Sequence, residues 1–175
     1  MNTMKTLKLF LGLIPLVMLL GCDKKENVHV EVDKYVQLLK SNKYIHSELP
    51  AFGLEAIDEL LKYRNEKSII TNFPRNGLSS LYQSECMLGI YILWTIESIR
   101  VETTNPKLFG RFPSSNPALR LRDLSGGLIL IDSKEAHQAA SNAYNSWWSM
   151  KGLTGADFNT WLKIDPLEGT KYAWH

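Results

Sequence analysis

The histidines are the side chains best suited to hold a metal ion, and they are widely scattered in this sequence. They stand at positions 29, 46, 137 and 175: His29, His46, His137 and His175. A protein metal site needs several histidine, cysteine or carboxylate ligands close together. Glu135 precedes His137, but the two are not one helical turn apart and do not share a face. The sequence therefore predicts neither a metal site nor a bound cofactor.

The carboxylates offer a different chemistry, that of an acid–base hydrolase. Glu85, Glu97 and Asp132 are the candidate acid–base groups. On one helix, Glu85 and Glu97 would be roughly 18 Å apart, which is too far for them to act together on one bond. Glu97 also precedes Arg100 by three residues, a spacing that favours an ion pair on one helix face. A hydrolase thus remains the alternative, and we predict no catalytic residue.

Cys86 is the only cysteine beyond position 22, and it raises the question of a cysteine nucleophile. Such a nucleophile needs a base, for which His137 is a candidate, and a third orienting group. However, Cys86 opens the uncharged run 86–96, where an apolar environment raises a thiol pKa and makes the sulfur unreactive. We expect Cys86 to be a buried structural residue.

Aromatic side chains gather near the C-terminus. They are Trp147, Trp148, Trp161, Tyr172 and Trp174. Adjacent residues on a helix point about 100° apart, so two neighbouring tryptophans do not fit one narrow buried face. The arc that holds Trp147 also holds Tyr144 and is predicted to face the core, which leaves Trp148 at the rim. Trp148, Trp174 and Tyr172 form the candidate binding surface, and the alternative is that all the aromatic residues belong to the core.

Helices are predicted to position these residues. Apolar residues at helical spacing predict helices over 32–42, 52–66 and 84–99. Gly89, within the third of these, would let another backbone approach closely. Ser133 as N-cap and Gly152 just past the end bound a fourth helix. A shorter helix follows, capped by Thr154.

The strands are predicted to be few. The segments "ALRLRD" (118–123) and "GLILID" (127–132) flank Ser125-Gly126-Gly127, a pattern typical of a β-hairpin. The closing "IDPLEGTKYAWH" contains a candidate terminal strand. The fold class is therefore mainly α: a compact helical domain of helical hairpins with one small β-hairpin, in a single globular domain over 32–175. The segments "PAFGLEAIDELLKYR" and "MLGIYILWTIESIRVE" loosely resemble HEAT-like repeat helices, although no repeat period is present.

The N-terminus has the pattern of a secretory signal. Lys5 and Lys8 precede an apolar run from Leu9 to Leu20, which is too short to span a bilayer. The run ends on "LLGC", residues 19–22. This ending resembles the lipobox of bacterial lipoproteins.

That resemblance implies a signal peptide over 1–21, cleavage before Cys22, a diacylglyceryl group on the Cys22 sulfur and an acyl chain, such as palmitate, on the new amino group. Residues 22–31 would then be a lipidated tether. An ordinary secretory signal that happens to contain a cysteine is the alternative. Asp23 resembles the inner-membrane retention signal of enteric bacteria, but other lineages sort differently, so inner and outer membrane both stay open.

The charge composition argues against a nucleic-acid partner. The formal net charge of +2 includes Lys5 and Lys8, so the mature chain is close to neutral and lacks the clustered basic face of a nucleic-acid-binding protein. The chain resembles small uncharacterised lipoproteins of Gram-negative bacteria in "LWTIESIR" and "IDPLEGTKYAWH". That resemblance implies a domain outside the cytoplasm and brings no known activity. We expect a non-catalytic binding module with a protein partner, of immunity or inhibitor type, or an envelope glycan. The alternative is a hydrolase of envelope polysaccharide or peptidoglycan.

Overall fold

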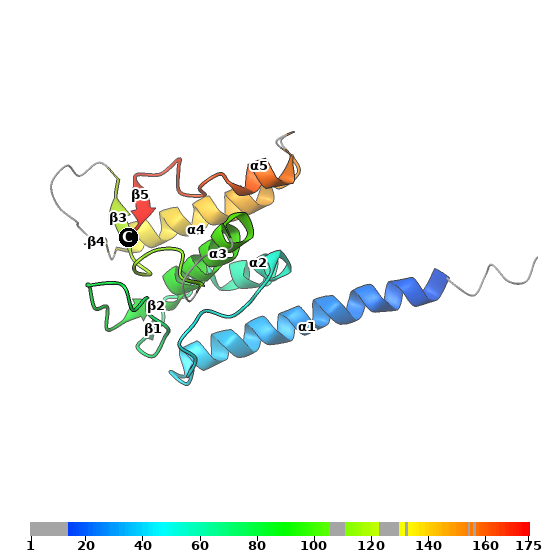
Figure 1. Cartoon of the computed structure of the whole chain (residues 1–175), viewed down its shortest axis with the longest axis horizontal. Helices are drawn as coiled ribbons and strands as arrows, with labels where there is room; N and C mark the ends of the chain where they lie inside the picture. Colours follow the sequence, from blue (N-terminus) through cyan, green and yellow to red (C-terminus); the bar gives the residue numbers. More distant parts are fainter. Residues whose placement is uncertain (1–13, 106–110, 123–129, 132, 154, 156) are drawn as a thin grey trace, which may run out of the picture.

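The protein is described by a computed structural model that covers residues 14–105, 111–122, 130–131, 133–153, 155 and 157–175. The fold is mainly helical, as expected (Figure 1). Its helices are α1 (Ile14–Lys40), α2 (Ile57–Leu60), α3 (Leu88–Thr104), α4 (Lys134–Ser149) and α5 (Phe158–Leu162). Two short 3-10 helices, η1 (Leu54–Ala56) and η2 (Leu61–Tyr63), flank α2.

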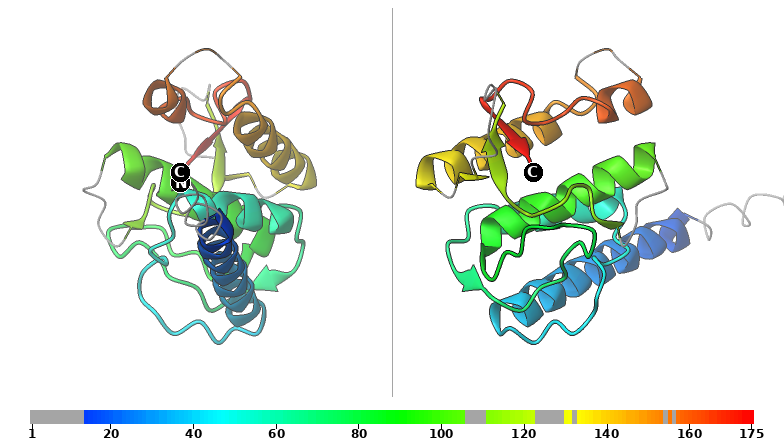
Figure 2. Two further views of the ribbon diagram at one scale, coloured as in Figure 1. Left: turned by 90° about the vertical axis from the view of Figure 1, so that its right-hand side faces the viewer. Right: turned by 60° about the vertical axis from the view of Figure 1, so that its left-hand side comes forward.

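Helix α3 is the centre of the domain. Every residue from Leu88 to Arg100 is buried, because α3 contacts α2, α4 and α5 (Figures 1 and 2). Trp94 stacks on Phe112 with 5.4 Å between ring centroids, and its indole N–H donates to Ser114 Oγ at 2.8 Å. The uncharged run in the sequence thus forms the core helix that its composition predicts.

The start of α3 differs from the prediction. Cys86 and Met87 form strand β2 (Cys86–Met87), which pairs antiparallel with β1 (Ile69–Ile70), so the helix begins at Leu88 and not near residue 84. The first amides of α3 are satisfied from outside the helix. Leu88 N–H donates to Ser68 O at 2.8 Å, and the next amide donates to Glu66 O at 2.9 Å.

Gly89 sits where three segments meet. A Cβ atom at this position would lie 2.4 Å from His137 Nε2 on α4 and 2.6 Å from the Arg64 carbonyl oxygen after η2. The imidazole itself is hydrogen-bonded, with 2.7 Å between His137 Nε2 and Arg64 O. The predicted close approach at Gly89 is therefore confirmed.

The segment 52–66 is not the single helix that its apolar spacing predicts. Only Ile57–Leu60 is α-helical, and tighter 3-10 turns precede and follow it. Arg64 closes the last turn, because its backbone N–H donates to Leu61 O at 3.3 Å and its guanidinium Nη1 donates to the same oxygen at 2.7 Å. These bonds replace the α-helical pattern with the shorter 3-10 spacing.

The predicted hairpin strands and the terminal strand form one small sheet. β3 (Leu119–Leu121) lies between β4 (Leu130–Ile131) and β5 (Tyr172–Trp174), and both neighbours are antiparallel to it. Leu119 is opposite Ile131 on one side and Trp174 on the other. The pairing of β3 with β4 confirms the hairpin strands, while its predicted turn, 125–127, lies outside the described residues.

Of the caps predicted for the last two helices, those of α4 are seen in the structure, and α5 has a different N-cap. Ser133 Oγ accepts from Ala136 N–H at 3.1 Å, which confirms the N-cap of α4, and Gly152 has the positive φ of 77° expected just past its end. Helix α5 is capped by Asp157, whose Oδ1 accepts from the amides of residues 159 and 160, each at 3.0 Å. Thr154, the predicted cap, lies outside the described residues.

Helix α1 runs without a break through the segment expected to be a tether, residues 22–31. Its contacts with the domain begin before residue 32: Val28 packs against the core, and His29 Nδ1 is 2.7 Å from Glu59 Oε2. Within the part of the chain that the structure describes, no helix has both the length and the apolar character needed to cross a membrane.

Candidate functional site

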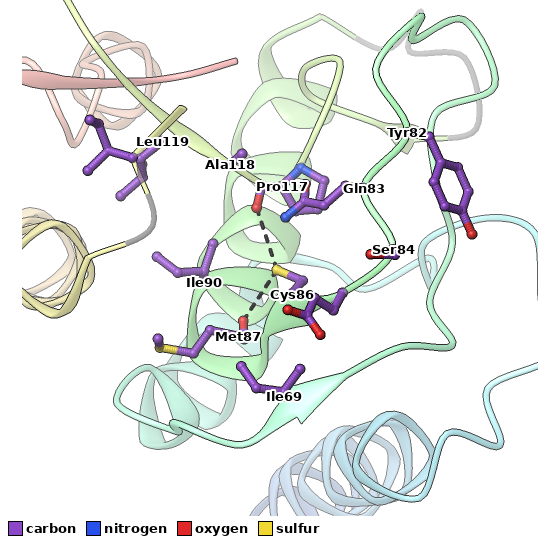
Figure 3. A pocket seen from close by; sticks show the side chains of 12 residues that line it. Ile69, Tyr82, Gln83, Ser84, Cys86, Met87, Ile90, Pro117, Ala118 and Leu119 are labelled. Carbon is purple, nitrogen blue, oxygen red and sulfur yellow. Dashed lines mark hydrogen bonds between the residues drawn. The ribbon is translucent and has the colours of Figure 1, made fainter. Parts of the chain in front are cut away.

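A cavity of about 270 Å³ lies beside Cys86, between the β1–β2 pair, the start of α3 and the sheet of β3 and β4 (Figure 3). Its floor is apolar and includes Met87, Ile90 and Leu119. Its polar lining comes from the segment before β2, including Gln83 and Glu85. A concave site with an apolar floor and a few polar groups is the usual form of a binding pocket.

Arg75 fixes the loop 71–85 that forms one wall of the cavity. Its Nε donates to Gln83 O at 2.8 Å and its Nη2 donates to Thr71 O at 2.8 Å. The guanidinium carbon also lies 4.2 Å from the ring centroid of Phe73 and 5.2 Å from that of Tyr82. Arg75 thus holds the shape of the loop, because its guanidinium binds carbonyl groups near both ends of the loop.

This wall exposes apolar side chains. In the loop, Tyr82 is 76% exposed, Leu78 is 77% exposed and Leu81 is also exposed, and so is Ile69 on the adjoining strand β1. Tyr82 and Ile69 line the cavity itself, Tyr82 at its outer end (Figure 3). Large exposed apolar groups that gather near a pocket mark interaction sites. We call Ile69, Leu78, Leu81 and Tyr82 the loop surface.

Gln83 lines the cavity, but its side-chain oxygen is buried behind the lining. Its side-chain Oε1 is buried and has no hydrogen-bond partner among the described residues. An unpaired buried acceptor is unfavourable by about 1–3 kcal/mol. Because this oxygen is inaccessible to solvent, it is not available to a molecule bound in the cavity.

Cys86 is buried, as predicted, and lies in the wall of the cavity. Its sulfur is 3.4 Å from Met87 O and 3.5 Å from Pro117 O, distances at which the thiol donates weakly to a carbonyl (Figure 3). The candidate base His137 is engaged elsewhere, with the Arg64 carbonyl. The geometry therefore gives Cys86 a packing role and does not assemble a Cys–His nucleophile.

The three candidate carboxylates are not brought together. Glu85 lines the cavity and is exposed, Glu97 is buried on α3, and Asp132 lies outside the described residues. A glycoside hydrolase needs two carboxyl groups facing one bond. Among the described lining residues Glu85 is the only carboxylate, so the cavity does not present that pair.

Glu97 and Arg100 form the predicted ion pair, and it is buried. Arg100 Nε donates to Glu97 Oε2 at 2.8 Å, and Nη2 donates to Oε1 at 2.6 Å. Tyr144 O–H donates to the same carboxylate at 2.7 Å and accepts from Trp174 Nε1 at 2.8 Å. Burial opposes the charge on Arg100, but Glu97 outweighs it and raises the pKa of the guanidinium. Burial, with the Glu97 charge, also holds the pKa of Tyr144 well above its usual value. This hydrogen-bond network joins α3, α4 and β5, so Glu97 has a structural role.

The candidate aromatic surface is not a surface. Trp148 is 7% exposed and Tyr172 is buried, while Trp174 is only partly exposed and is occupied by the bond to Tyr144. The expectation that Trp148 lies at a rim is wrong. Its Nε1 donates to Asp58 Oδ1 at 2.5 Å, so α2 supplies the acceptor that lets this indole be buried. Trp147 faces the core as predicted and stacks on Trp161, with 4.6 Å between centroids and 9° between planes.

The histidines remain apart in the fold. His29 contacts Glu59 and Asp33, His137 contacts Arg64, and His46 packs on Tyr44. Within the described ranges, no three histidine, cysteine or carboxylate side chains are grouped to hold a metal ion.

The loop surface was missed by reasoning from sequence. The signal was present, because Pro74 and Asn76-Gly77 mark 71–85 as a loop, and Leu78, Leu81 and Tyr82 are large apolar residues within it. Such residues in a surface loop have no helix or strand face on which to be buried.

The chain belongs to the family described as a domain of unknown function (DUF4943), whose model matches residues 26–175. No curated protein and no solved structure is significantly similar to it. The family match begins within α1, two residues before Val28, which packs against the core.

Proposed function

We propose that this protein is an envelope lipoprotein, anchored through acyl chains on Cys22, whose domain binds a protein partner without catalysing a reaction. The anchor is supported by the lipobox-like "LLGC" at 19–22 and by the short apolar run before it. Two or three acyl chains hold a protein firmly to a bilayer, whereas a single chain binds weakly. The domain would then lie outside the cytoplasm, on the inner or the outer membrane.

The observation that carries the binding role is the cavity, whose lining includes the exposed side chains of Tyr82 and Ile69. Tyr82 and Arg75 lie together there, and tyrosine and arginine are the residue types enriched at binding hot spots. The loop that presents them is tied to the core, because Tyr91 on α3 donates from its hydroxyl to Pro74 O at 3.0 Å. A preformed loop loses little conformational entropy on binding.

A protein partner fits this site better than a glycan does. The floor formed by Met87, Ile90 and Leu119 suits an apolar side chain, and the exposed Ile69 and Tyr82 add further apolar area to the lining. A lipoprotein of immunity or inhibitor type, which holds a toxic protein at the membrane, is one form of this role.

The test is site-specific photo-crosslinking in cells that make the full-length protein. A benzophenone amino acid replaces Tyr82 in one strain and Ile45, an apolar residue that is 87% exposed and outside the loop surface, in a control strain. We expect a discrete protein adduct from position 82 and none from position 45. Recovery of that partner with the Tyr82→Ser variant should fall at least tenfold, and the Ile45→Ser variant should retain it.

Two outcomes would contradict the proposal. Equal adducts from both positions would mean that the loop surface has no special role. Undiminished recovery of the partner with Tyr82→Ser, in a protein that unfolds at the same urea concentration as the wild type, would place the binding site elsewhere.

A further inference from the structure

Both nitrogens of the His29 ring face a carboxylate. Nδ1 lies 2.7 Å from Glu59 Oε2 on α2, and Nε2 lies 3.4 Å from Asp33 Oδ2, one turn further along α1. A neutral imidazole has one N–H donor and one acceptor nitrogen, whereas the imidazolium has two donors. Only the protonated ring can donate to both carboxylates, so this arrangement suits the charged form of His29.

We propose that His29 is a pH-dependent clamp that sets the point at which helix α1 leaves the domain. With the ring protonated, α1 is held against α2 from Val28 onwards. When the ring loses its proton, one of its nitrogens becomes an acceptor that faces a carboxylate oxygen. The helix then detaches as far as Val32, whose side chain is completely buried. Histidine is the side chain that ordinarily changes charge between pH 5 and 8.

The other polar groups of the cluster keep their charge in that range. Glu59 also accepts from Lys62 Nζ, and Asp33 Oδ1 accepts from the Tyr63 hydroxyl at 2.5 Å. Burial opposes the charge on Glu59, but hydrogen bonds from Lys62 and His29 outweigh it and lower the pKa of that carboxyl. The bond to Asp33 raises the pKa of Tyr63 to about 12. The two carboxylates therefore stay in place as acceptors while the imidazole changes its charge.

Three further acids near this part of α1 do not contact the ring. Glu26, one turn before His29, and Glu55 on η1, which also packs on α1, are exposed and form no ion pair with it within the described ranges. Asp58 on α2 accepts from Trp148 Nε1 at 2.5 Å instead. Strand β1, which also contacts α1, contains only isoleucines. The response to pH is thus expected to come from one imidazole between two carboxylates.

This end of the docked helix is weakly held, so a small change is enough to release it. Val28 is only partly buried and Val30 is 56% exposed, whereas Val32 and Val36 are completely buried. Helix ends open locally at little cost in free energy, while segments with buried side chains open far less readily. Because His29 is half-exposed, we expect the loss of its ion pairs to shift the docking equilibrium about fivefold and not more.

The clamp has a consequence for a membrane anchor, and only this consequence rests on the proposed function. Figures 1 and 2 show the N-terminal half of α1 extending away from the domain. If Cys22 carries the acyl chains, detachment from Val28 to Val32 adds four residues to the tether. Fully extended, these residues span at most about 14 Å. The domain and its loop surface would then reach farther from the bilayer at higher pH.

The test is hydrogen exchange of the full-length protein in detergent micelles, followed by mass spectrometry at about pH 5.5 and about pH 8.5. Each exchange rate is divided by the intrinsic rate at the same pH, because the chemistry of exchange itself depends on pH. We expect the protection of amides 28–32 to be about fivefold lower at the higher pH. The protection of amides 36–40, in the buried part of the same helix, should not change.

Three variants identify the group that responds. His29→Arg is charged at both pH values and can donate to both carboxylates, so protection of amides 28–32 should stay high throughout. His29→Gln is neutral, and its protection should be low at both pH values. His46→Gln is the matched control, because His46 is also exposed but packs on Tyr44 outside the cluster. This control should keep the pH dependence of the wild type.

Each of three results would overturn the clamp. Equal protection of amides 28–32 at both pH values in the wild type would mean that His29 does not hold the helix. A pH dependence that persists in His29→Gln would assign the response to another group. Low protection in His29→Arg would show that charge is not what docks α1. None of these results bears on lipidation, which the mass of the N-terminal peptide reports separately.

Discussion

Gly89→Ala isolates the contact on which the packing of α3 against α4 depends. The added methyl carbon would meet His137 Nε2 at 2.4 Å and the Arg64 carbonyl oxygen at 2.6 Å, and the second of these is backbone that cannot rotate away. Overpacking of this kind is destabilising by about 1–3 kcal/mol. Displacing the imidazole also breaks its bond to Arg64, and a buried group left unpaired adds about 1–3 kcal/mol.

Helix propensity works in the other direction. Replacing glycine by alanine inside a helix stabilises it by about 1 kcal/mol. The net expectation is that Gly89→Ala lowers the free energy of unfolding by about 2–3 kcal/mol. Gly169→Ala is the matched control, because a Cβ there meets no atom within 4 Å and the backbone does not have a positive φ. The Gly169→Ala substitution should change the free energy of unfolding by no more than about 0.5 kcal/mol.

The assay is urea denaturation followed by tryptophan fluorescence, with the slope m compared between variants to confirm that only stability has changed. The double variant Gly89→Ala/His137→Ala should lower the free energy of unfolding by less than the sum of the two single variants, because removing the imidazole removes one of the two clashes. A Gly89→Ala protein as stable as the wild type, or more stable, would refute the account of this contact.

Three further predictions concern the core and the charges around it. Trp147→Ala should lower the unfolding free energy by about 3–5 kcal/mol, because it removes the ring stacked on Trp161; a loss below 1 kcal/mol in urea denaturation would contradict this. Burial alone would raise the pKa of Glu59, but hydrogen bonds from Lys62 and His29 outweigh it and lower that pKa. The resulting stabilisation, up to about 1 kcal/mol, is complete above about pH 5 and is lost as the pH falls through the lowered pKa. The stability difference between wild type and Glu59→Gln should therefore shrink below pH 4, and a constant difference would argue against the contact. Cys86 should react with a thiol reagent at least tenfold faster in urea than in the native protein, and rapid native labelling would contradict its burial.

Local patterns predict the features of this fold that depend on neighbours in sequence. The uncharged run 86–96 indicates a buried helix, and Ser133 and Gly152 bound α4, because caps and helical faces are set within a few residues. The pairing of Leu119 with Ile131 is also local enough to be visible as alternation on both sides of a glycine turn.

Features that depend on distant partners were not visible. Cys86 is in a strand because it pairs with Ile70, which lies in a separate segment of the chain. Trp148 is buried because Asp58, far away in sequence, accepts its indole N–H. Helical phase alone places adjacent tryptophans on different arcs, and it cannot show that a second helix supplies an acceptor for the outer one.

The candidate site was the least predictable part. Its cavity forms between two small sheets and the start of α3, and its exposed rim comes from a loop whose shape depends on Arg75. The cluster of aromatic residues near the C-terminus predicted a binding surface of Trp148, Trp174 and Tyr172. The exposed aromatic residue at the cavity is instead Tyr82. Tertiary packing decides which aromatic residues reach the surface.

The central claim is that Cys22 carries the membrane anchor. The most direct measurement is mass spectrometry of the mature protein isolated from membranes, with sequencing of its N-terminal peptide. The account predicts a peptide that begins at Cys22 and is heavier than its sequence by a diacylglyceryl group and an amide-linked acyl chain. A mature protein that begins at another residue, or whose Cys22 is unmodified, would contradict the account.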